Sequence, residues 1–452
     1  MMIFKILLGL VGLGIVVFVH ELGHFLAARL VGIDVEAFSI GWGKPVLKKK
    51  LGAVEYRLGM LPLGGYCKMK GENEFQQAFE NKQKAIDPAP GSFFAASPLR
   101  RIIVSFAGPF FNLVFAVLVM SVIWGIGFEV NTLENRIVLL SDIKTGSTNP
   151  ADEAGLKTGD RILEINGNKT ENYHDIQENI AVHPEEKLSV TVDRDGEILH
   201  FTVIPSLEKS TGAGRIGVYF WTDPIISEVA AGSPAEKAGL KSGDRIRSVN
   251  GNDFAYSVKL IPILEEKPGS LKLEYERGGL IQNTELELSY SDSGEADPGI
   301  SWQTIKYRTP YLNPFAALAT GTVKTWQTFV ISLKSLSLLF RGIDLTQAVS
   351  GPVRITYMVG DVAAEGFGQS FATGLSSMTN FLALISVALC IMNLLPLPIL
   401  DGGMILLFII EALRRKPLPP RAIYVFQTIG AVLIFSLMLF AVFGDILFLT
   451  KH

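Results

Sequence analysis

A candidate metal-binding and catalytic group is formed by His20, Glu21 and His24, in the run His-Glu-Leu-Gly-His. Residues four apart on a helix lie on one face, about 6 Å from each other, so both imidazoles can reach one metal ion. A carboxylate beside two such ligands can take a proton from an attacking water and pass it to the leaving amine of a peptide. The pattern therefore predicts a zinc hydrolase in which Glu21 is the general base.

The pattern is short, but it lies within an apolar run over residues 3–30, which strengthens the prediction of a metal site. Ionisable groups cost several kcal/mol to bury unpaired in a membrane, so they indicate function there. Catalytic zinc usually takes three protein ligands. Asp401 is the one ionisable residue between about 373 and 410, and it follows Asn393 and two prolines that break an apolar run. A broken helix is tolerated at that depth where protein or a watery cavity satisfies its backbone, so Asp401 is the predicted third ligand.

The candidate site residues lie in or beside apolar runs that predict membrane helices. The chain has 452 residues, of which 48% are hydrophobic and 19% charged, and this balance is typical of a membrane protein. Four apolar runs are long enough to span a bilayer: 3–30, 102–126, 373–399 and 422–449. The stretch 312–340 is also fairly apolar, but Lys324 and Lys334 favour an amphipathic helix on the membrane surface. We therefore expect a polytopic α-helical protein with four transmembrane helices.

The orientation follows from lysine and arginine in the two connections that join the first span to the second and the third span to the fourth. Residues 44–101 and 414–421 are both rich in these residues, which places them in the cytoplasm. Both termini and the large insert between the second and third spans then lie on the opposite side of the membrane, which in the inner membrane of a bacterium would be the periplasm. Net charge is only −3, without a long basic block, so we expect no nucleic-acid partner. Cys67 and Cys390 lie too far apart in sequence to indicate a thiolate zinc site.

The insert contains an internal repeat. Residues 150–168 and 234–252 match at an offset of 84 residues, and both contain Ala-Gly-Leu-Lys, Gly-Asp-Arg-Ile and Asn-Gly-Asn. A repeat this close indicates two copies of one module. Its pattern resembles the bacterial PDZ domain, an α+β fold that binds peptides by strand addition and holds a terminal carboxylate in backbone amides. We expect Gly214–Val218 to supply the carboxylate loop of the second copy. The tandem could bind peptides or act only as a size filter.

The predicted boundaries follow from these patterns. They are an N-terminal membrane half at 1–128 with a membrane-associated β-hairpin at 38–70, PDZ-like domains at 129–222 and 223–305, an amphipathic periplasmic or interfacial segment at 306–372, and a C-terminal membrane half at 373–452.

His-Glu-Leu-Gly-His on one helix and Leu400-Asp401-Gly402 on another resemble the site-2 proteases, which are intramembrane zinc metalloproteases. The match extends along nearly the whole chain, and Leu63–Met69 and Ala107–Asn112 are further family signatures. The resemblance implies that His20, His24 and Asp401 bind Zn²⁺ and that Glu21 is the base. It also implies substrate-binding roles, carried by Asn393 and by the hairpin residues Gly64, Gly65 and Tyr66. Ala388 stands where an asparagine is expected, so a role shared by such a pair is in doubt.

The resemblance further implies regulated proteolysis of single-span membrane proteins: an anti-sigma factor stub in a sigma-E stress response, and remnant signal peptides. The expected surroundings are membrane lipid, and the expected state is a monomer. Two other readings stay open. One is a membrane-anchored zincin with its site in a soluble domain, which would need a downstream glutamate or histidine ligand. The other is an inactive PDZ scaffold, against which the intact Glu21 and Asp401 count.

Overall fold

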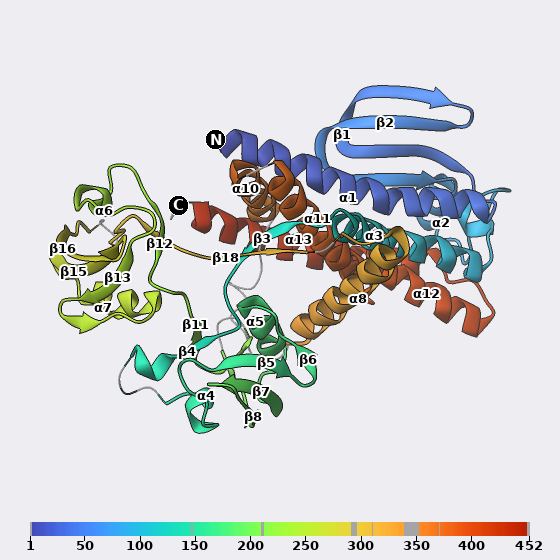
Figure 1. Cartoon of the computed structure of the whole chain (residues 1–452). Helices are drawn as coiled ribbons and strands as arrows, with labels where there is room; N and C mark the ends of the chain where they lie inside the picture. The colour runs from blue at the N-terminus through green and yellow to red at the C-terminus, as the bar shows by residue number, and fades with distance from the viewer. Residues whose placement is uncertain are drawn as a thin grey trace. The chain divides into compact units, whose positions relative to one another are not determined.

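The computed structural model describes residues 2–144, 146, 148–208, 212–290, 296–309, 311–338, 352–369 and 371–449. The chain divides into two compact units. The first contains the residues before Glu129 and most of those after Arg308, and the second contains Glu129–Arg308 (Figure 1). The first unit holds the long apolar helices, and the second holds the repeats.

Within the described residues, four helices are long and apolar enough to cross a membrane. The spans are Gly9–Leu30, Pro98–Ile126, Gly374–Leu394 and Pro420–Val442. They lie in α1 (Met2–Leu30), α3 (Pro98–Ile126), α11 (Phe371–Leu394) and α13 (Pro420–Leu449). The predicted number of spans is confirmed. The third span ends five residues before the predicted residue 399, because Pro396 and Pro398 cannot continue its hydrogen-bond ladder.

Four further helices belong to the first unit: α2 (Glu72–Glu80), α8 (Pro314–Leu338), α10 (Pro352–Gln369) and α12 (Asp401–Arg414). A short 3₁₀ turn, Phe93–Ala95, precedes α3. α8 is not among the candidate spans, and Lys324 of α8 lies over the ring of Trp124 at 5.3 Å. α10 packs directly on α1, since a Cβ added at Gly9 would lie 2.1 Å from the carbonyl oxygen of Thr356. Residues 310, 339–351 and 370 of the predicted 306–372 segment lie outside the described residues.

The predicted hairpin at 38–70 corresponds to β1 (Val35–Leu51) and β2 (Val54–Met69), which pair antiparallel. Both strands bend, so that residues 37–40 have partners on two sides, 65–68 on one and 55–58 on the other. Residues 47–51 pair with the other side of the segment 54–58. Several β-bulges accommodate this doubling back. The segment 65–69 therefore forms an edge, because its other side has no strand partner among the described residues.

An apolar cluster joins this sheet to α1 and α3. Phe38 of β1 contacts Phe18 and Phe25 of α1, with ring centroids 5.9 and 5.3 Å apart. Ala28 and Val104 are buried in the same cluster. Aromatic pairs at such distances add to the free energy of burial, so the sheet edge is held against the helix that carries the histidines.

The second unit contains the two copies predicted from the repeat. The first copy has a sheet in the order β6-β5-β7-β8 and the second has β14-β13-β15-β16, so the copies share one strand order. The strands of the first sheet are β5 (Arg161–Ile165), β6 (Asn168–Lys169), β7 (Leu188–Arg194) and β8 (Glu197–Val203). Those of the second are β13 (Arg245–Val249), β14 (Asn252–Asp253), β15 (Ser270–Arg277) and β16 (Leu280–Glu287). The copies carry the helices α4 (Pro150–Glu153) and α5 (Tyr173–Ala181), and α6 (Pro234–Lys237) and α7 (Leu260–Glu265).

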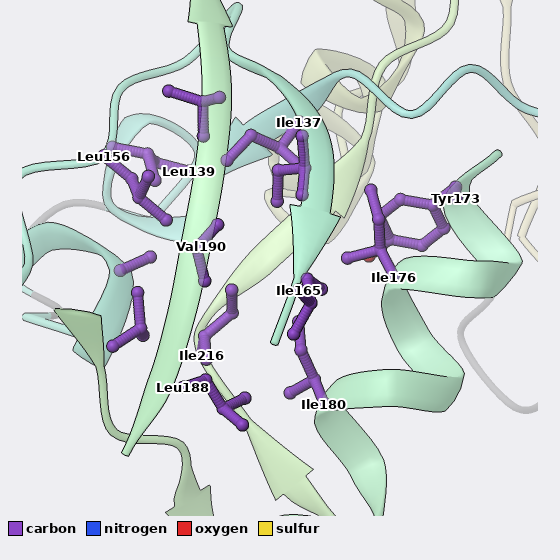
Figure 2. Close-up of a cluster of buried hydrophobic side chains, with 14 residues drawn as sticks. Ile137, Leu139, Leu156, Ile165, Tyr173, Ile176, Ile180, Leu188, Val190 and Ile216 are labelled. Atoms are coloured by element: carbon purple, nitrogen blue, oxygen red, sulfur yellow. The ribbon is translucent and has the colours of Figure 1, made fainter. Parts of the chain in front are cut away.

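Short strands complete this unit: β3 (Glu129–Thr132), β4 (Ile137–Leu139), β9 (Ser206–Leu207), β10 (Gly214–Arg215), β11 (Val218–Phe220), β12 (Ile226–Val229), β17 (Ile300–Trp302) and β18 (Ile305–Arg308). The 3₁₀ turns are Leu140–Asp142 and Ser257–Lys259. β3 pairs with β18, so the two ends of the insert lie side by side. Each copy has its own core, and Figure 2 shows that of the first, where Ile165, Ile176 and Val190 meet between sheet and helix.

The repeated Gly-Asp-Arg-Ile places equivalent buried carboxylates in both copies. Asp160 receives two hydrogen bonds from the guanidinium of Arg194, and Asp244 receives two from Arg277. Both carboxylates are 1% exposed, and each also accepts from a backbone amide three residues earlier. Bidentate pairing satisfies a charge that would otherwise be costly to bury. The repeated aspartate therefore has a structural role.

The prediction that Gly214–Val218 serves the second copy is wrong. Ile216 is buried in the core of the first copy (Figure 2), and Val218 of β11 pairs with Leu139 of β4. The hydroxyl of Tyr173, the first residue of α5, donates to the carbonyl oxygen of Val218 at 2.9 Å. The chain thus completes the first core with a segment that follows β8 before it enters the second copy, and no local sequence signal marks that order.

Candidate metal centre

His20 and His24 lie on one face of α1, as their spacing predicts, and their Nε2 atoms are 3.2 Å apart. The Nδ1 of His24 lies 2.8 Å from the carbonyl oxygen of Val104 on α3. A carbonyl can only accept, so Nδ1 carries the proton and the Nε2 lone pair is free for a metal ion. Backbone of a neighbouring helix thereby fixes both the tautomer and the direction of this ring.

Asp401 reaches the two histidines from the break between α11 and α12. Its Oδ2 is 3.3 Å from the Nε2 of His20 and 3.4 Å from the Nε2 of His24. α11 ends at Leu394 and α12 begins at Asp401, with Ile399 at φ +74° between them. A Cβ added at Gly402 or Gly403 would lie 2.3 or 2.0 Å from a carbonyl oxygen of this break. The Leu-Asp-Gly-Gly sequence thus allows the tight return that presents the carboxylate to α1.

The three ligand atoms fit a tetrahedral zinc ion. At Zn–N and Zn–O distances of about 2.0–2.1 Å, ligand atoms at tetrahedral corners lie roughly 3.3–3.4 Å apart. The observed separations are 3.2, 3.3 and 3.4 Å. Oδ2 of Asp401 is also buried without a hydrogen-bond partner among the described residues. A buried carboxylate oxygen needs such a partner or a metal ion, so these residues fit the metal that the sequence predicts.

Close packing of α1 on α3 brings the imidazoles against backbone. A Cβ added at Gly23 would lie 2.4 Å from the carbonyl oxygen of Ala107. One added at Gly108 would lie 2.3 Å from Nε2 of His24 and 2.8 Å from Cε1 of His20. Asn112, one turn further along α3, is fully buried, and its Nδ2 lies 3.3 Å from Nδ1 of His20. The signature Ala107–Asn112 therefore forms the wall behind the two histidines.

A cavity of about 730 Å³ opens beside the three candidate ligands. Glu21, Asn393 and Tyr66 line it, so the structure brings these predicted site residues to one space. A Cβ added at Gly65 would lie 3.2 Å from Cγ of Glu21, which puts the sheet edge directly beside the predicted base. Gly64 has φ +88° and lies under the indole of Trp42, whose Nε1 donates to the carbonyl oxygen of Gly65 at 3.3 Å.

Sequence reasoning missed several residues of this site. Trp42 of β1, Val104 of α3 and Gln427 of α13 all line the cavity. Ser386 of α11 is fully buried and donates to the carbonyl oxygen of Asn112 at 2.9 Å. Gln427, the only amide in its apolar span, was visible as a candidate. The others have ordinary residue types whose importance depends on which helices touch.

Comparisons with known proteins identify the family of the chain. The model for peptidase family M50 matches residues 8–437. A relative from Treponema pallidum, described as a zinc metalloprotease, is 40% identical over 98% of this chain and 99% of its own. The chain belongs to peptidase family M50. The regulator of sigma E protease of Haemophilus influenzae is 33% identical over 97% of each chain. The regulator of sigma-E protease RseP of Escherichia coli is 32% identical over 96% of this chain and 97% of its own.

Membership of family M50, the site-2 proteases, identifies the enzyme as a zinc metalloprotease, and the four candidate spans make it a multi-pass membrane protein. The predicted enzyme class and metal are confirmed. A solved PDZ domain of the SdrC-like protein from Listeria monocytogenes aligns with 18% of this chain and 88% of its own, at 24% identity and a TM-score of 0.17.

Proposed function

We propose that this protein cleaves single-span membrane proteins at a zinc site held by His20, His24 and Asp401, with Glu21 as general base. The observation that carries the proposal is the convergence of two Nε2 atoms and one carboxylate oxygen at 3.2–3.4 Å from one another. Bound zinc would polarise the scissile carbonyl and lower the pKa of the attacking water. Glu21 takes the proton from that water and delivers it to the leaving amine.

Asn393 and the edge formed by Gly64, Gly65 and Tyr66 hold the substrate in this proposal. A transmembrane helix must unwind before its peptide bonds can be cut, and an extended segment needs partners for its backbone groups. The edge 65–69 offers main-chain donors and acceptors beside Glu21, and strand addition to such an edge is a common way to bind peptides. Trp42 donates to the carbonyl of Gly65, so an arriving strand would displace its indole.

Four point variants in purified full-length protein test the roles. We expect His20→Ala, His24→Ala and Asp401→Ala to lose zinc and activity. Glu21→Gln should keep one equivalent of zinc and lose turnover, because the base is not a ligand. The measurements are bound zinc and cleavage of a model transmembrane peptide. Ser436→Ala, on an exposed part of α13, is the control. A full equivalent of zinc with near-normal cleavage in Asp401→Ala would refute the ligand set.

The names of two relatives, which are regulators of sigma E, support a proposal for the biological setting. We assign this protein to the inner membrane of a bacterium, with both termini and the insert in the periplasm, and to regulated proteolysis in a sigma-E response. Its substrates would be an anti-sigma factor already trimmed outside the membrane, and remnant signal peptides. Comparing the membrane peptides that accumulate in cells carrying Glu21→Gln with those of wild type tests this, and equal peptide sets would refute it.

The repeats act, in our proposal, as two PDZ domains that exclude bulky substrates. A groove of about 570 Å³ lies between α5 and the segment 214–219 of the first copy. Inside this groove, the hydroxyl of Tyr173 donates a hydrogen bond to the carbonyl oxygen of Val218. An added peptide strand would need that carbonyl oxygen as a hydrogen-bond acceptor. This internal bond favours a filter over peptide capture.

Deleting residues 130–305 separates the two uses of the insert. A filter predicts that the deletion leaves hydrolysis of a short transmembrane peptide intact and allows cleavage of a substrate that keeps its bulky periplasmic domain. Peptide capture predicts weaker cleavage of trimmed substrates, mainly through KM. No gain on the untrimmed substrate, in a variant still active on the short peptide, would exclude the filter.

A further inference from the structure

We propose that Asn112 is a positioning residue that fixes the tautomer and orientation of His20 by accepting a hydrogen bond from its Nδ1. The inference rests on the proposed role of His20 as a metal ligand. Nδ2 of Asn112 lies 3.3 Å from Nδ1 of His20, while Nε2 of the same ring points toward Asp401 and His24. Asn112 is the one described side chain with a hydrogen-bond contact to that Nδ1.

The chemistry of a ligating imidazole decides which amide atom belongs there. When Nε2 gives its lone pair to a metal ion, the proton of the neutral ring resides on Nδ1, which then needs an acceptor. The amide nitrogen of Asn112 can only donate, whereas its Oδ1 is buried without a partner among the described residues. Rotating the side-chain amide of Asn112 by 180° exchanges its Oδ1 and Nδ2 atoms, which are nearly equal in size, and places Oδ1 beside the Nδ1–H of His20.

His24 provides the parallel case within the same site. Its Nδ1 has the Val104 carbonyl as acceptor at 2.8 Å, so one ring is oriented by the backbone of α3 and the other by a side chain of α3. Two turns of helix separate the two acceptor residues. The two histidines are four positions apart on α1 and their two acceptor residues are eight positions apart on α3, so both rings reach α3 only where the two helices pack closely. Gly23 and Gly108 allow that approach.

The surroundings of Asn112 hold it in this place. Its side chain is 0% exposed, and its own carbonyl oxygen accepts from the hydroxyl of Ser386 on α11 at 2.9 Å. α11 leads directly into the break that presents Asp401. The hydrogen bond from Ser386 therefore connects α11, which precedes Asp401, to Asn112, which orients His20. Through this bond Asn112 contacts both the helix before Asp401 and the histidine on α1.

Zinc affinity of the full-length protein in detergent, measured by competition with a chelator, tests the inference without relying on turnover. We expect Asn112→Leu, which keeps the volume and removes the acceptor, to weaken zinc binding about 10–100-fold. Asn112→Asp keeps an acceptor oxygen and should bind zinc markedly more tightly than Asn112→Leu. Ser121→Ala is the matched control on α3, since the hydroxyl donates its hydrogen bond to the Val117 carbonyl of its own helix. Co²⁺ absorption spectra should change in Asn112→Leu and not in Ser121→Ala.

The outcomes separate this inference from the proposed function. If His20→Ala loses zinc while Asn112→Leu binds it with wild-type affinity and an unchanged Co²⁺ spectrum, the positioning role is wrong and the ligand set stands. If His20→Ala retains zinc, both fail. Should Asn112→Leu not fold, Asn112→Ala and Asn112→Asp decide, since equal zinc affinity in these two would show that the acceptor has no effect.

Discussion

Replacing Gly108 with alanine should remove zinc from a protein that still folds. The added Cβ would lie 2.3 Å from Nε2 and 2.6 Å from Cε1 of His24, and 2.8 Å from Cε1 of His20. Ordinary van der Waals contact begins at 3.4 Å, so Nε2 of His24 must move by at least 1.1 Å. Metal–ligand distances tolerate deviations of about 0.2 Å. The required displacement is several times larger, and it falls on the atom that would bind the ion.

The variant should nevertheless keep its fold, because the nearest atoms belong to side chains that can rotate. We expect bound zinc to fall from one equivalent to a small fraction at micromolar free zinc, with loss of peptide cleavage. The measurements are metal content after gel filtration and thermal unfolding in detergent. Gly14→Ala is the matched control, since a Cβ on that glycine of α1 meets no atom within 4 Å. A Gly108→Ala protein with full zinc content would contradict this prediction, because it would show that α3 shifts while the imidazoles keep their positions.

The remaining predictions concern the other interactions of the two units. Glu411→Gln should destabilise the membrane unit by about 3–5 kcal/mol, because Arg101 and Glu411 form a buried ion pair between α3 and α12; unchanged thermal unfolding would contradict this. Arg194→Met and Arg277→Met should each destabilise its own copy by about 3–5 kcal/mol, since each leaves a carboxylate that is 1% exposed without its guanidinium; hydrogen exchange of the two sheets reports which copy is affected. Reporters fused at Glu72 and Lys416 should read cytoplasmic and one at Asn168 periplasmic; a periplasmic signal at Lys416 would require another span. Tyr173→Phe should strengthen any binding of carboxyl-terminal peptides to the first copy by freeing the Val218 carbonyl, and unchanged binding would mean that this bond does not block the groove.

The candidate ligands were predictable because membranes make ionisable residues rare. The apolar runs contain few residues that could bind a metal ion, among them two histidines four positions apart and the aspartate that follows a broken run. The number of spans was predictable for the same physical reason, since length and apolar composition suffice. The repeat was equally visible, because two copies of one sequence need one strand order.

Other features depend on contacts that no local pattern encodes. The doubling back of β1 and β2 is accompanied by β-bulges. Gly214–Val218 precedes the second repeat in the sequence, whereas Ile216 fills the first core. Asn112 belonged to a visible signature, but its contact with His20 exists only because α1 and α3 meet at Gly23 and Gly108.

The glycines of this site explain how a membrane enzyme can fix a metal geometry with so few polar residues. Apolar side chains pack against one another but give no direction to an imidazole, and each added hydroxyl or amide costs free energy in the bilayer. Backbone carbonyls are already present at every turn of α3. Gly23 and Gly108 bring α1 close enough for His24 to use the carbonyl of Val104, so one ring is oriented without any additional polar side chain. Only His20, one turn before His24 on α1, needs Asn112. Because the helices cross so closely, a single buried amide is the only additional polar side chain needed to orient the two imidazoles. Replacing one glycine of this crossing should therefore reduce the bound zinc as much as replacing a ligand does.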